Sequence, residues 1–283
     1  MRVRFWGARG NLATPGAEFV RYGGNTPCVE VLADAEDHRL ILDAGTGIIP
    51  AGRALMAETP LGRGAGEILL ILSHPHIDHI QGFPFFAPIY VRGNVVRVRC
   101  AATEGRSTFD VLEEELSPNY SPLYSLNELH ATFDIQDWDG QSMSSGPLAV
   151  SAFLVPHGRR ESSGVLVREG ATCLAYVPNV EYDDEAAMTR VADAVRGASM
   201  LVHDAMHVPA DVPQRRGYGH SSYEEAVHVA RRAGVRHLVL FHHDPDRDDA
   251  AVDEAVAAAR ALAQSLGLDM VICAAAEGST LAL

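Results

Sequence analysis

Short apolar runs recur along the chain, and a polar side chain follows each of them. Runs of this length bounded by polar or turn residues are typical of buried β-strands. Functional side chains in layered α/β folds collect at strand ends and in the loops that follow. We therefore expect five such strands to bring their polar neighbours to one rim. The runs and the residues that follow them are ILLIL before Ser73 and His74, AFLVP before His157, CLAYVP before Asn179, MLV before His203 and Asp204, and HLVLF before His242 and His243.

The segment after the first run holds three histidines and one aspartate within six residues. Side chains two apart on an extended segment point the same way, so His74 and His76 can reach one ion. Asp78 and His79 turn toward a neighbouring point, which gives the geometry of two adjacent cation sites. Imidazole suits zinc and related divalent ions, and a carboxylate adds a negatively charged ligand. The alternative is a histidine-rich surface turn. The polar residues that follow the other apolar runs argue against this alternative.

The chain has 283 residues, of which 47% are hydrophobic, and this content predicts one large globular domain spanning residues 1–283. Neither a membrane helix nor a secretory leader is expected, because the sequence shows no long apolar span and no charged and then apolar N-terminal stretch. Cys28, Cys100, Cys173 and Cys273 are scattered, mostly within apolar runs. They are expected to be buried thiols of a cytoplasmic protein.

The formal net charge of −14 bears on the partner of this protein. A protein that grips a long nucleic acid usually carries a basic face, whereas the longest basic runs here are adjacent pairs of arginines. We therefore expect a small-molecule substrate, no long nucleic acid and no membrane partner. Bound metal ions would offset part of the negative charge locally, so an anionic substrate stays compatible with this composition.

Five motifs follow one another along nearly the whole chain. They are the His-x-His-x-Asp-His segment at 74–79, the lone His157, YVPNVE at 176–181, GHSS at 219–222 and FHHDP at 241–245. In this order they resemble the metallo-β-lactamase superfamily. They are most similar to its branch that contains ribonuclease Z and the cyclic phosphodiesterases, including the phosphoribosyl cyclic phosphate phosphodiesterase. The resemblance implies an α/β fold, the four-layer αβ/βα sandwich of the metallo-β-lactamases, with two halves that meet near residue 140.

The resemblance also implies a binuclear metal centre. Two divalent metal ions are expected, zinc (Zn2+) by default because so many of the ligands are imidazoles, with manganese (Mn2+) or iron (Fe) as alternatives. A homodimer is expected from the family alone. The ligands that the resemblance assigns are His74, His76 and His157 at the first site and Asp78, His79 and His242 at the second.

Asn179 departs from the family pattern, which has an aspartate that bridges both metals at this position. An asparagine offers one neutral carbonyl oxygen and no charge, so metal affinity should be weaker, most plainly at one of the two positions. Glu181 is only two residues away, but it belongs to the family's own pattern. Three explanations stay open: a natural variant that works with a weaker or single metal, a substitution made to trap a substrate, and a natural protein that has lost catalysis.

His220 stands directly before a predicted helix, and we do not assign it to a metal. Ser221 or Ser222, with a glutamate three positions on, forms a capping-box signature, and Gly234 ends the helix. A helix N-terminus favours anions, so a phosphate could sit beside His220. In the phosphodiesterase branch the matching histidine assists catalysis, and an acidic residue at the position of Asp204 holds it. The alternative is a histidine that merely precedes a helix.

These residues predict a metal-dependent hydrolase, in the first place a phosphodiesterase that acts on small phosphodiesters, including cyclic ones. A metal-bound hydroxide would attack phosphorus, with Asp78 in the catalytic group. His220, oriented by Asp204, would donate a proton to the leaving oxygen. The candidates for substrate binding are Asn25, Phe83 and Ser221, although core packing is the commoner use of aromatic residues such as Phe83.

Two other classes of function stay open. An acyl hydrolase acting on lactones, thioesters or β-lactams could use the same hydroxide, although those branches generally lack the GHSS element. A catalytically impaired binding protein is the second alternative, and it rests only on Asn179. A ribonuclease Z acting on tRNA is disfavoured, because we find no arm rich in glycine and basic residues. Residues 107–138 are expected to form a helix over FDVLEEEL and a long loop beside the pocket entrance.

Overall fold

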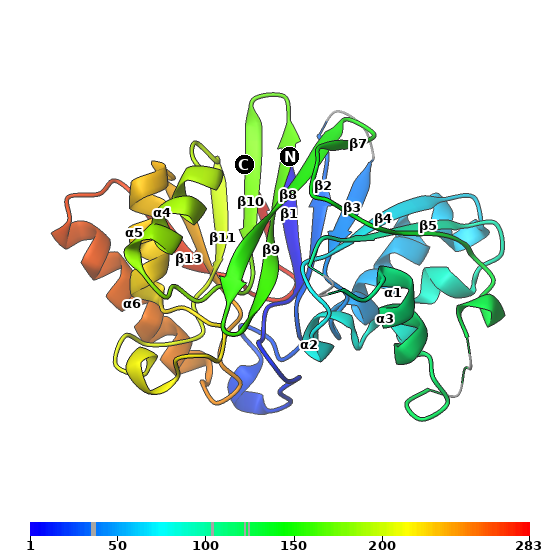
Figure 1. Ribbon diagram of the computed structural model, residues 1–283, viewed down its shortest axis with the longest axis horizontal. Helices are drawn as coiled ribbons and strands as arrows, with labels where there is room; N and C mark the ends of the chain where they lie inside the picture. Colours follow the sequence, from blue (N-terminus) through cyan, green and yellow to red (C-terminus); the bar gives the residue numbers. More distant parts are fainter. Residues whose placement is uncertain (35–37, 103–104, 122, 124) are drawn as a thin grey trace.

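The computed structural model describes residues 1–34, 38–102, 105–121, 123 and 125–283. Within these residues the chain forms two seven-stranded sheets that stand side by side in the centre of the molecule (Figure 1). In spatial order, the first sheet consists of β14 (Thr280–Ala282), β1 (Arg2–Gly7), β2 (Cys28–Leu32), β3 (Arg39–Leu42), β4 (Glu67–Leu72), β5 (Val95–Cys100) and β6 (Thr132–Asp137). The second sheet consists of β13 (Val271–Ala274), β12 (His237–Phe241), β11 (Met200–Asp204), β10 (Thr172–Val177), β9 (Arg160–Glu169), β8 (Leu148–His157) and β7 (Met143–Ser145).

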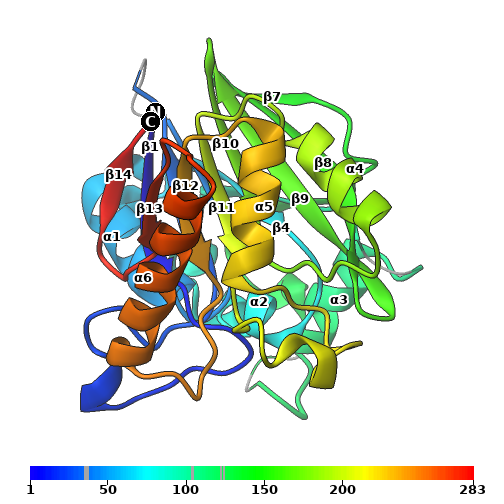
Figure 2. The same cartoon turned by 90° about the vertical axis from the view of Figure 1, so that its left-hand side faces the viewer.

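Helices cover the outer face of each sheet, so that the described residues form four layers (Figure 1). The first sheet is covered by α1 (Ile48–Glu58) and α3 (Thr108–Glu115). The second is covered by α4 (Glu185–Ala194), α5 (Tyr223–Ala233) and α6 (Asp249–Ser265), which Figure 2 shows from outside. Shorter helical turns lie in the loops: α2 (Ile77–Ile80), η1 (Ala17–Phe19), η2 (Pro60–Arg63), η3 (Phe83–Phe85), η4 (Ala87–Tyr90), η5 (Leu126–Glu128) and η6 (Val212–Gln214).

Strand β10 shows how the sequence builds these layers. Cys173 and Ala175 pack into the core beneath the helices, while Leu174 and Tyr176 lie in the core between the two sheets. Successive side chains of a strand point to opposite faces, so a strand that is covered on both sides needs an unbroken apolar run. This requirement explains the run CLAYV, and the ring of Tyr176 meets that of Phe241 from β12 at 5.5 Å between centroids.

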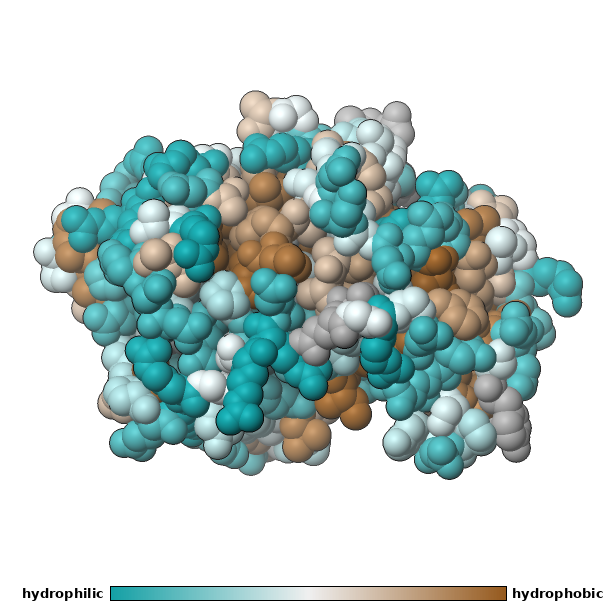
Figure 3. Space-filling view, viewed as in Figure 1, coloured by the Kyte–Doolittle hydropathy of each residue, from teal (hydrophilic) through white to brown (hydrophobic). Residues whose placement is uncertain are grey.

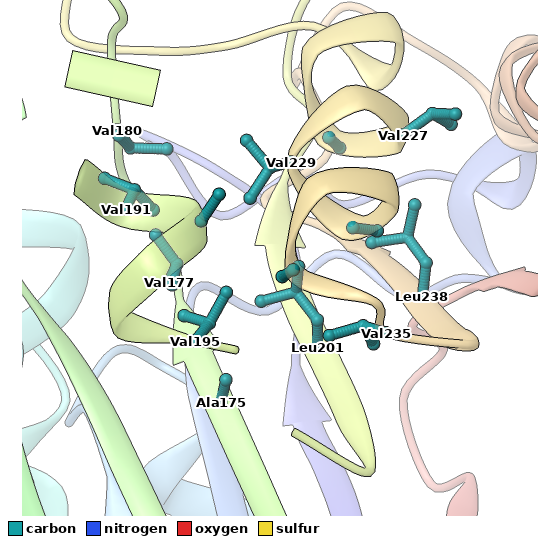
Figure 4. Close-up of a cluster of buried hydrophobic side chains, with 14 of the residues drawn as sticks. Ala175, Val177, Val180, Val191, Val195, Leu201, Val227, Val229, Val235 and Leu238 are labelled. Atoms are coloured by element: carbon teal, nitrogen blue, oxygen red, sulfur yellow. The ribbon is translucent and has the colours of Figure 1, made fainter. Parts of the chain in front are cut away.

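The helices pack on the second sheet through small and β-branched side chains. Figure 4 shows Val177 of β10 close to Val191 and Val195 at the end of α4, and all three belong to one buried cluster. Helix α5 has the predicted boundaries. Ser222 caps its N-terminus in a complete capping box, and Gly234 ends it in the left-handed conformation at φ 70°.

The predicted four-layer sandwich is confirmed, and the halves meet between β6 and β7, close to the predicted residue 140. One element crosses this division: β14, from the end of the chain, pairs antiparallel with β1, which brings the two termini side by side (Figure 2). The predicted helix over 109–116 is α3. Of the loop that follows it, residues 122 and 124 lie outside the described residues. The single-domain organisation over residues 1–283 stays a prediction.

The surface agrees with the acidic composition of the chain. The face in Figure 3 is mainly hydrophilic, with smaller hydrophobic patches near its middle. Among the described residues, no helix is both long enough and apolar enough to cross a membrane.

Candidate metal centre

Candidate residues stand at or just after the ends of β4, β8, β10, β11 and β12. Helix α2 lies between the halves of the molecule (Figure 1). In the second sheet, β10, β11 and β12 run parallel, with Val177 opposite His203 and Asp204 opposite Phe241. The residues that follow these strands therefore leave the sheet at the same edge. Within the described residues, the ligand atoms of each of two groups lie within 4.8 Å of one another. The groups are His74, His76 and His157, and Asp78, His79 and His242.

The first group consists of three imidazoles. The Nδ1 atom of His157 donates to the carbonyl oxygen of Gly219, so its Nε2 carries the lone pair, and this atom lies 3.1 Å from Nδ1 of His76. The Nε2 atom of His74 is buried and has no hydrogen-bond partner. Burial lowers the pKa of His157 to about 3 and that of His76 to about 4. Neutral imidazoles with facing lone pairs fit a divalent cation.

The second group adds a carboxylate to two imidazoles. Oδ2 of Asp78 lies 3.1 Å from Nε2 of His242 and 3.4 Å from Nε2 of His79, and these two nitrogens are 3.3 Å apart. His242 holds a left-handed backbone at φ 60°, an uncommon conformation for a side-chain-bearing residue. Burial lowers the pKa of His79, but Asp78 and Asp43 more than offset this effect and raise it to about 10. A bound cation would take the place of the proton on Nε2 of His79.

Asp43 supports the second group without joining it. Its carboxylate accepts hydrogen bonds from Nδ1 of His79 at 2.8 Å, from the hydroxyl of Tyr176 at 2.7 Å, and from the backbone amide of Ser73 at 2.7 Å. Because Nδ1 donates to Asp43, Nε2 of His79 is left to face the ligand group. Asp43 therefore orients His79 and the start of the loop that follows β4.

Glu181 supports the first group through a glycine loop, a role that the sequence analysis missed. Its two carboxylate oxygens accept from the backbone amides of Gly217 and Gly219, each at 2.7 Å. Gly219 in turn accepts the hydrogen bond from His157 and precedes His220. The signal in the sequence was the pair of glycines before His220, whose exposed amides suit a carboxylate.

Asp204 and His220 form a buried pair beside both groups. Nδ1 of His220 lies 2.9 Å from Oδ2 of Asp204, which also accepts from the backbone amide of Val180. The ring of His220 stacks on His242 at 4.8 Å and meets the edge of His157 at 5.3 Å. Asp204, His220 and His242 themselves form a third group of ligand atoms within 4.8 Å. The predicted pair is thus brought to the centre.

Asn179 lies in the loop that follows β10. The amide of the next residue donates to Asp204, and the amide of Glu181 donates to the carbonyl oxygen of Pro156, which directly precedes His157. Asn179 is therefore held between the strands of His157 and Asp204. Its Oδ1 atom is buried and has no hydrogen-bond partner. Such an orphaned acceptor fits a position beside a cation.

The three residues predicted to bind substrate make contacts within the protein, and their role in binding stays a prediction. Asn25 is committed to Glu277, whose carboxylate accepts from both its backbone and side-chain nitrogens. Phe83 is fully buried in the core of the first half, because the η3 turn directs its ring inward. Ser221 is also fully buried, and its hydroxyl donates to the backbone oxygen of Asp204.

Three further histidines lie near the centre. His203 accepts from the hydroxyl of Tyr182 and donates to the carbonyl oxygen of Asp204, which is a structural role. His243 donates to the carbonyl oxygen of Ala275, away from the two ligand groups. His207 is buried, and neither of its ring nitrogens has a hydrogen-bond partner.

Curated relatives of this chain carry the name ribonuclease Z. The protein from Thermoplasma volcanium is 37% identical over 74 residues, which cover 25% of this chain and 24% of that one. The first curated relatives are thus matched over about a quarter of their length. The protein from Bradyrhizobium sp. strain ORS 278 is 26% identical over 258 residues, which cover 75% of this chain and 82% of that one.

Solved structures share the fold of the whole chain. The metallo-beta-lactamase fold protein YhfI from Bacillus subtilis superimposes with a TM-score of 0.69 at 17% identity, covering 99% of each chain. A diphosphatase of the PhnP family superimposes with a TM-score of 0.65 at 20% identity, covering 100% of this chain and 97% of that one. The pattern of the beta-lactamase superfamily domain matches residues 38–243. The chain therefore belongs to the beta-lactamase superfamily and has its metallo-β-lactamase fold.

Proposed function

We propose that this protein is a metal-dependent hydrolase of phosphodiesters. The observation that carries the proposal is the convergence of two three-residue ligand groups from both halves of the fold, with the Asp204–His220 pair beside them. The names of the relatives support it, since ribonuclease Z and a diphosphatase both act on phosphate linkages.

The ligand groups fit two divalent cations, for which we propose zinc, with manganese or iron as alternatives. The residues that would hold the ions are His74, His76 and His157 in one group and Asp78, His79 and His242 in the other. We propose Asn179 as a further ligand, because its Oδ1 atom is buried and has no hydrogen-bond partner. Such ions, when bound, lower the pKa of a water molecule and polarise a phosphoryl oxygen. Asp43 and Glu181 keep the imidazoles in the orientation that this chemistry needs.

Asp204 and His220 would supply the proton for the leaving group. Burial raises the pKa of Asp204 to about 7 and lowers the pKa of His220 to about 4. The pair therefore takes up one proton near neutral pH, held in the hydrogen bond between Oδ2 of Asp204 and Nδ1 of His220. As the ester bond breaks, Nε2 of His220 gives its proton to the leaving oxygen, and Nδ1 receives the proton of Asp204.

A cavity beside the centre favours a small substrate. It has a volume of about 690 Å³, and the residues on either side of His76 line it. Small-molecule sites typically measure about 300–1,000 Å³. Ile77 and Phe85 form apolar walls and are 63% and 62% exposed. The charged residues of the lining are of both signs, and Arg106 pairs with Glu114 at 2.7 Å. We propose that the organic part of a small phosphodiester, including a cyclic one, lies here.

The cysteines support the proposed cytoplasmic location, because all four are free thiols. Three of them are fully buried, and none is paired in a disulfide. Secreted proteins more often use their cysteines in disulfides.

The proposal is tested with protein loaded with zinc, manganese or iron. We expect hydrolysis of bis-p-nitrophenyl phosphate and of members of a panel of cyclic phosphates, and loss of turnover in Asp78→Ala. His228→Ala is the matched control, because this histidine lies on the outer helix α5 and pairs there with Glu224. Activity on a lactone, thioester or β-lactam with none on phosphodiesters would contradict the proposal. So would the absence of turnover with every metal, both in this chain and in Asn179→Asp.

The role of His220 is tested with two leaving groups. A p-nitrophenolate leaves without help, whereas an alkoxide needs a proton in the transition state. His220→Ala should therefore slow hydrolysis of a methyl p-nitrophenyl diester little, and slow hydrolysis of a cyclic alkyl phosphate by about 10²- to 10⁴-fold. Equal losses on both substrates would show that His220 positions other groups and does not act as the acid.

A further inference from the structure

The two ligand groups of the metal centre differ in charge. The first group contains imidazoles only and brings no negative charge, whereas the second brings the carboxylate of Asp78. Part of that charge is engaged already, because Oδ2 of Asp78 accepts a hydrogen bond from the backbone amide of Asn11 at 2.9 Å. Two divalent cations held by these ligands would therefore keep most of their positive charge.

The other carboxylates near the centre act on the ions only from outside the first two ligand groups. Each of these carboxylates already forms hydrogen bonds with groups of the protein. Asp43 accepts from His79, Ser73 and Tyr176, and Glu181 accepts from Gly217 and Gly219. Asp204 accepts from Val180 and Met206 and shares a hydrogen bond with Nδ1 of His220.

Asn179 lies beside residues of the centre that come from the second sheet. Hydrogen bonds from the amides of Val180 and Glu181 fix its loop between the strands that end at His157 and Asp204. Its Oδ1 atom is buried and free of hydrogen bonds, so it is available as a ligand. An amide oxygen can coordinate a cation, but it carries no charge to offset the repulsion between two ions.

We propose that the two cation positions are coupled through the substrate: one ion binds to the protein alone, and the second binds tightly only together with an anionic phosphoester. This inference rests on the proposed phosphodiesterase function. The phosphoryl oxygens carry the negative charge that the amide of Asn179 lacks, and they lower the repulsion between neighbouring cations. Coupling of this kind is reciprocal, so the second ion raises the affinity for the anion by the same factor.

Calorimetric titration of the metal-free protein with zinc tests the coupling without measuring activity. The titration is run with and without phenylphosphonate, whose phosphorus–carbon bond replaces the ester bond, and the heat of zinc with phenylphosphonate alone is subtracted. We expect the first equivalent of zinc to bind equally in both cases. The second should bind about 5- to 150-fold more tightly with phenylphosphonate, the usual range for coupled ligands.

Two variants with the same change of charge assign the effect to Asn179. Asn179→Asp should bind two equivalents of zinc tightly without phenylphosphonate, and phenylphosphonate should then add little. Asn127→Asp should behave like the unmodified protein, because Asn127 lies exposed on η5. If Asn179→Asp does not fold, the affinity of the unmodified protein for phenylphosphonate at one and at two equivalents of zinc gives the same coupling factor.

The outcomes separate this inference from the proposed function. Two equivalents of zinc that bind alike with and without phenylphosphonate would overturn the coupling, and so would a coupling factor that is the same in Asn179→Asp. Failure of phenylphosphonate to bind at saturating zinc would instead contradict binding of a phosphoryl group at the centre, on which the proposed function rests.

Discussion

Asp43 and Glu181 act on the metal centre although neither belongs to a ligand group. Asp43 fixes which nitrogen of His79 faces the ligand group. Glu181 fixes the glycine loop that holds His157 and carries His220. Partners of this kind set the orientation and basicity of a ligand, so their loss weakens a metal site whose ligands are all still present.

Glu181→Gln tests whether Glu181 supports the metal centre, because it replaces a single carboxylate oxygen. One oxygen remains as an acceptor, but the other is replaced by an amino group that faces a backbone amide and repels it. We expect zinc affinity to fall by about 10- to 100-fold, measured by competition with a chelator. Glu113→Gln is the matched control, because Glu113 also accepts from a backbone amide, that of Leu126, but lies on α3 and belongs to no ligand group. Unchanged zinc affinity in Glu181→Gln would show that the loop is held by its other contacts.

The η3 turn separates two phenylalanines that have the same chemistry and different surroundings. Phe83 is fully buried and meets the ring of Phe133 at 6.3 Å, whereas Phe85 is 62% exposed in the wall of the cavity. The turn thus uses one aromatic ring for the core and the other for the proposed substrate pocket. The loop after α3 completes this wall with Tyr120 and Ser121, as expected for a loop beside the pocket entrance.

Alanine substitutions at these two positions should affect different properties: the stability of the fold at Phe83 and substrate binding at Phe85. Phe83→Ala leaves a cavity in the core and should lower the free energy of unfolding by about 3–5 kcal/mol, measured by urea denaturation. Phe85→Ala should change it by no more than about 0.5 kcal/mol. The same Phe85→Ala variant should raise KM for aryl phosphodiesters and change kcat little, because it removes binding surface that substrate and transition state contact alike. If Phe85→Ala lowers the free energy of unfolding and leaves KM unchanged, Phe85 serves core packing and does not bind the substrate.

The sequence predicts those elements whose burial follows a simple period. Strand β10 and its neighbours can be predicted from the sequence because both of their faces are apolar. The residues that follow these strands lie at one edge of the sheet because the strands are parallel. The direction of the Phe83 side chain cannot be predicted, because a short turn has neither the period of a strand nor that of a helix. The role of Glu181 depends on backbone amides, which every sequence has and which only the folded loop exposes. The pairing of β14 with β1 is a contact across the whole chain that local patterns do not encode.

At the scale of the whole molecule, the centre joins two halves of the chain. His74, His76, Asp78 and His79 follow β4 of the first sheet, while the ligands on the other side follow β8 and β12 of the second. The sheets also share an apolar core, to which Phe5 and Phe241 contribute from opposite sides. Cations at the centre would therefore link the sheets at the edge where loops, and not strands, meet.

This arrangement predicts that metal stabilises both halves together. Free zinc at about 100 times its dissociation constant should stabilise the fold by about 2.7 kcal/mol and raise Tm by about 5–10 °C over the chelated protein. His74→Ala in the first half and His157→Ala in the second should each remove most of this shift, whereas His228→Ala on α5 should keep it. Hydrogen exchange should show that zinc slows exchange in β4 and in β12 alike, because each ion position draws ligands from both sheets. Protection confined to one sheet would mean that the ion is held by one half alone, since a cation that links the sheets cannot stabilise one of them without the other.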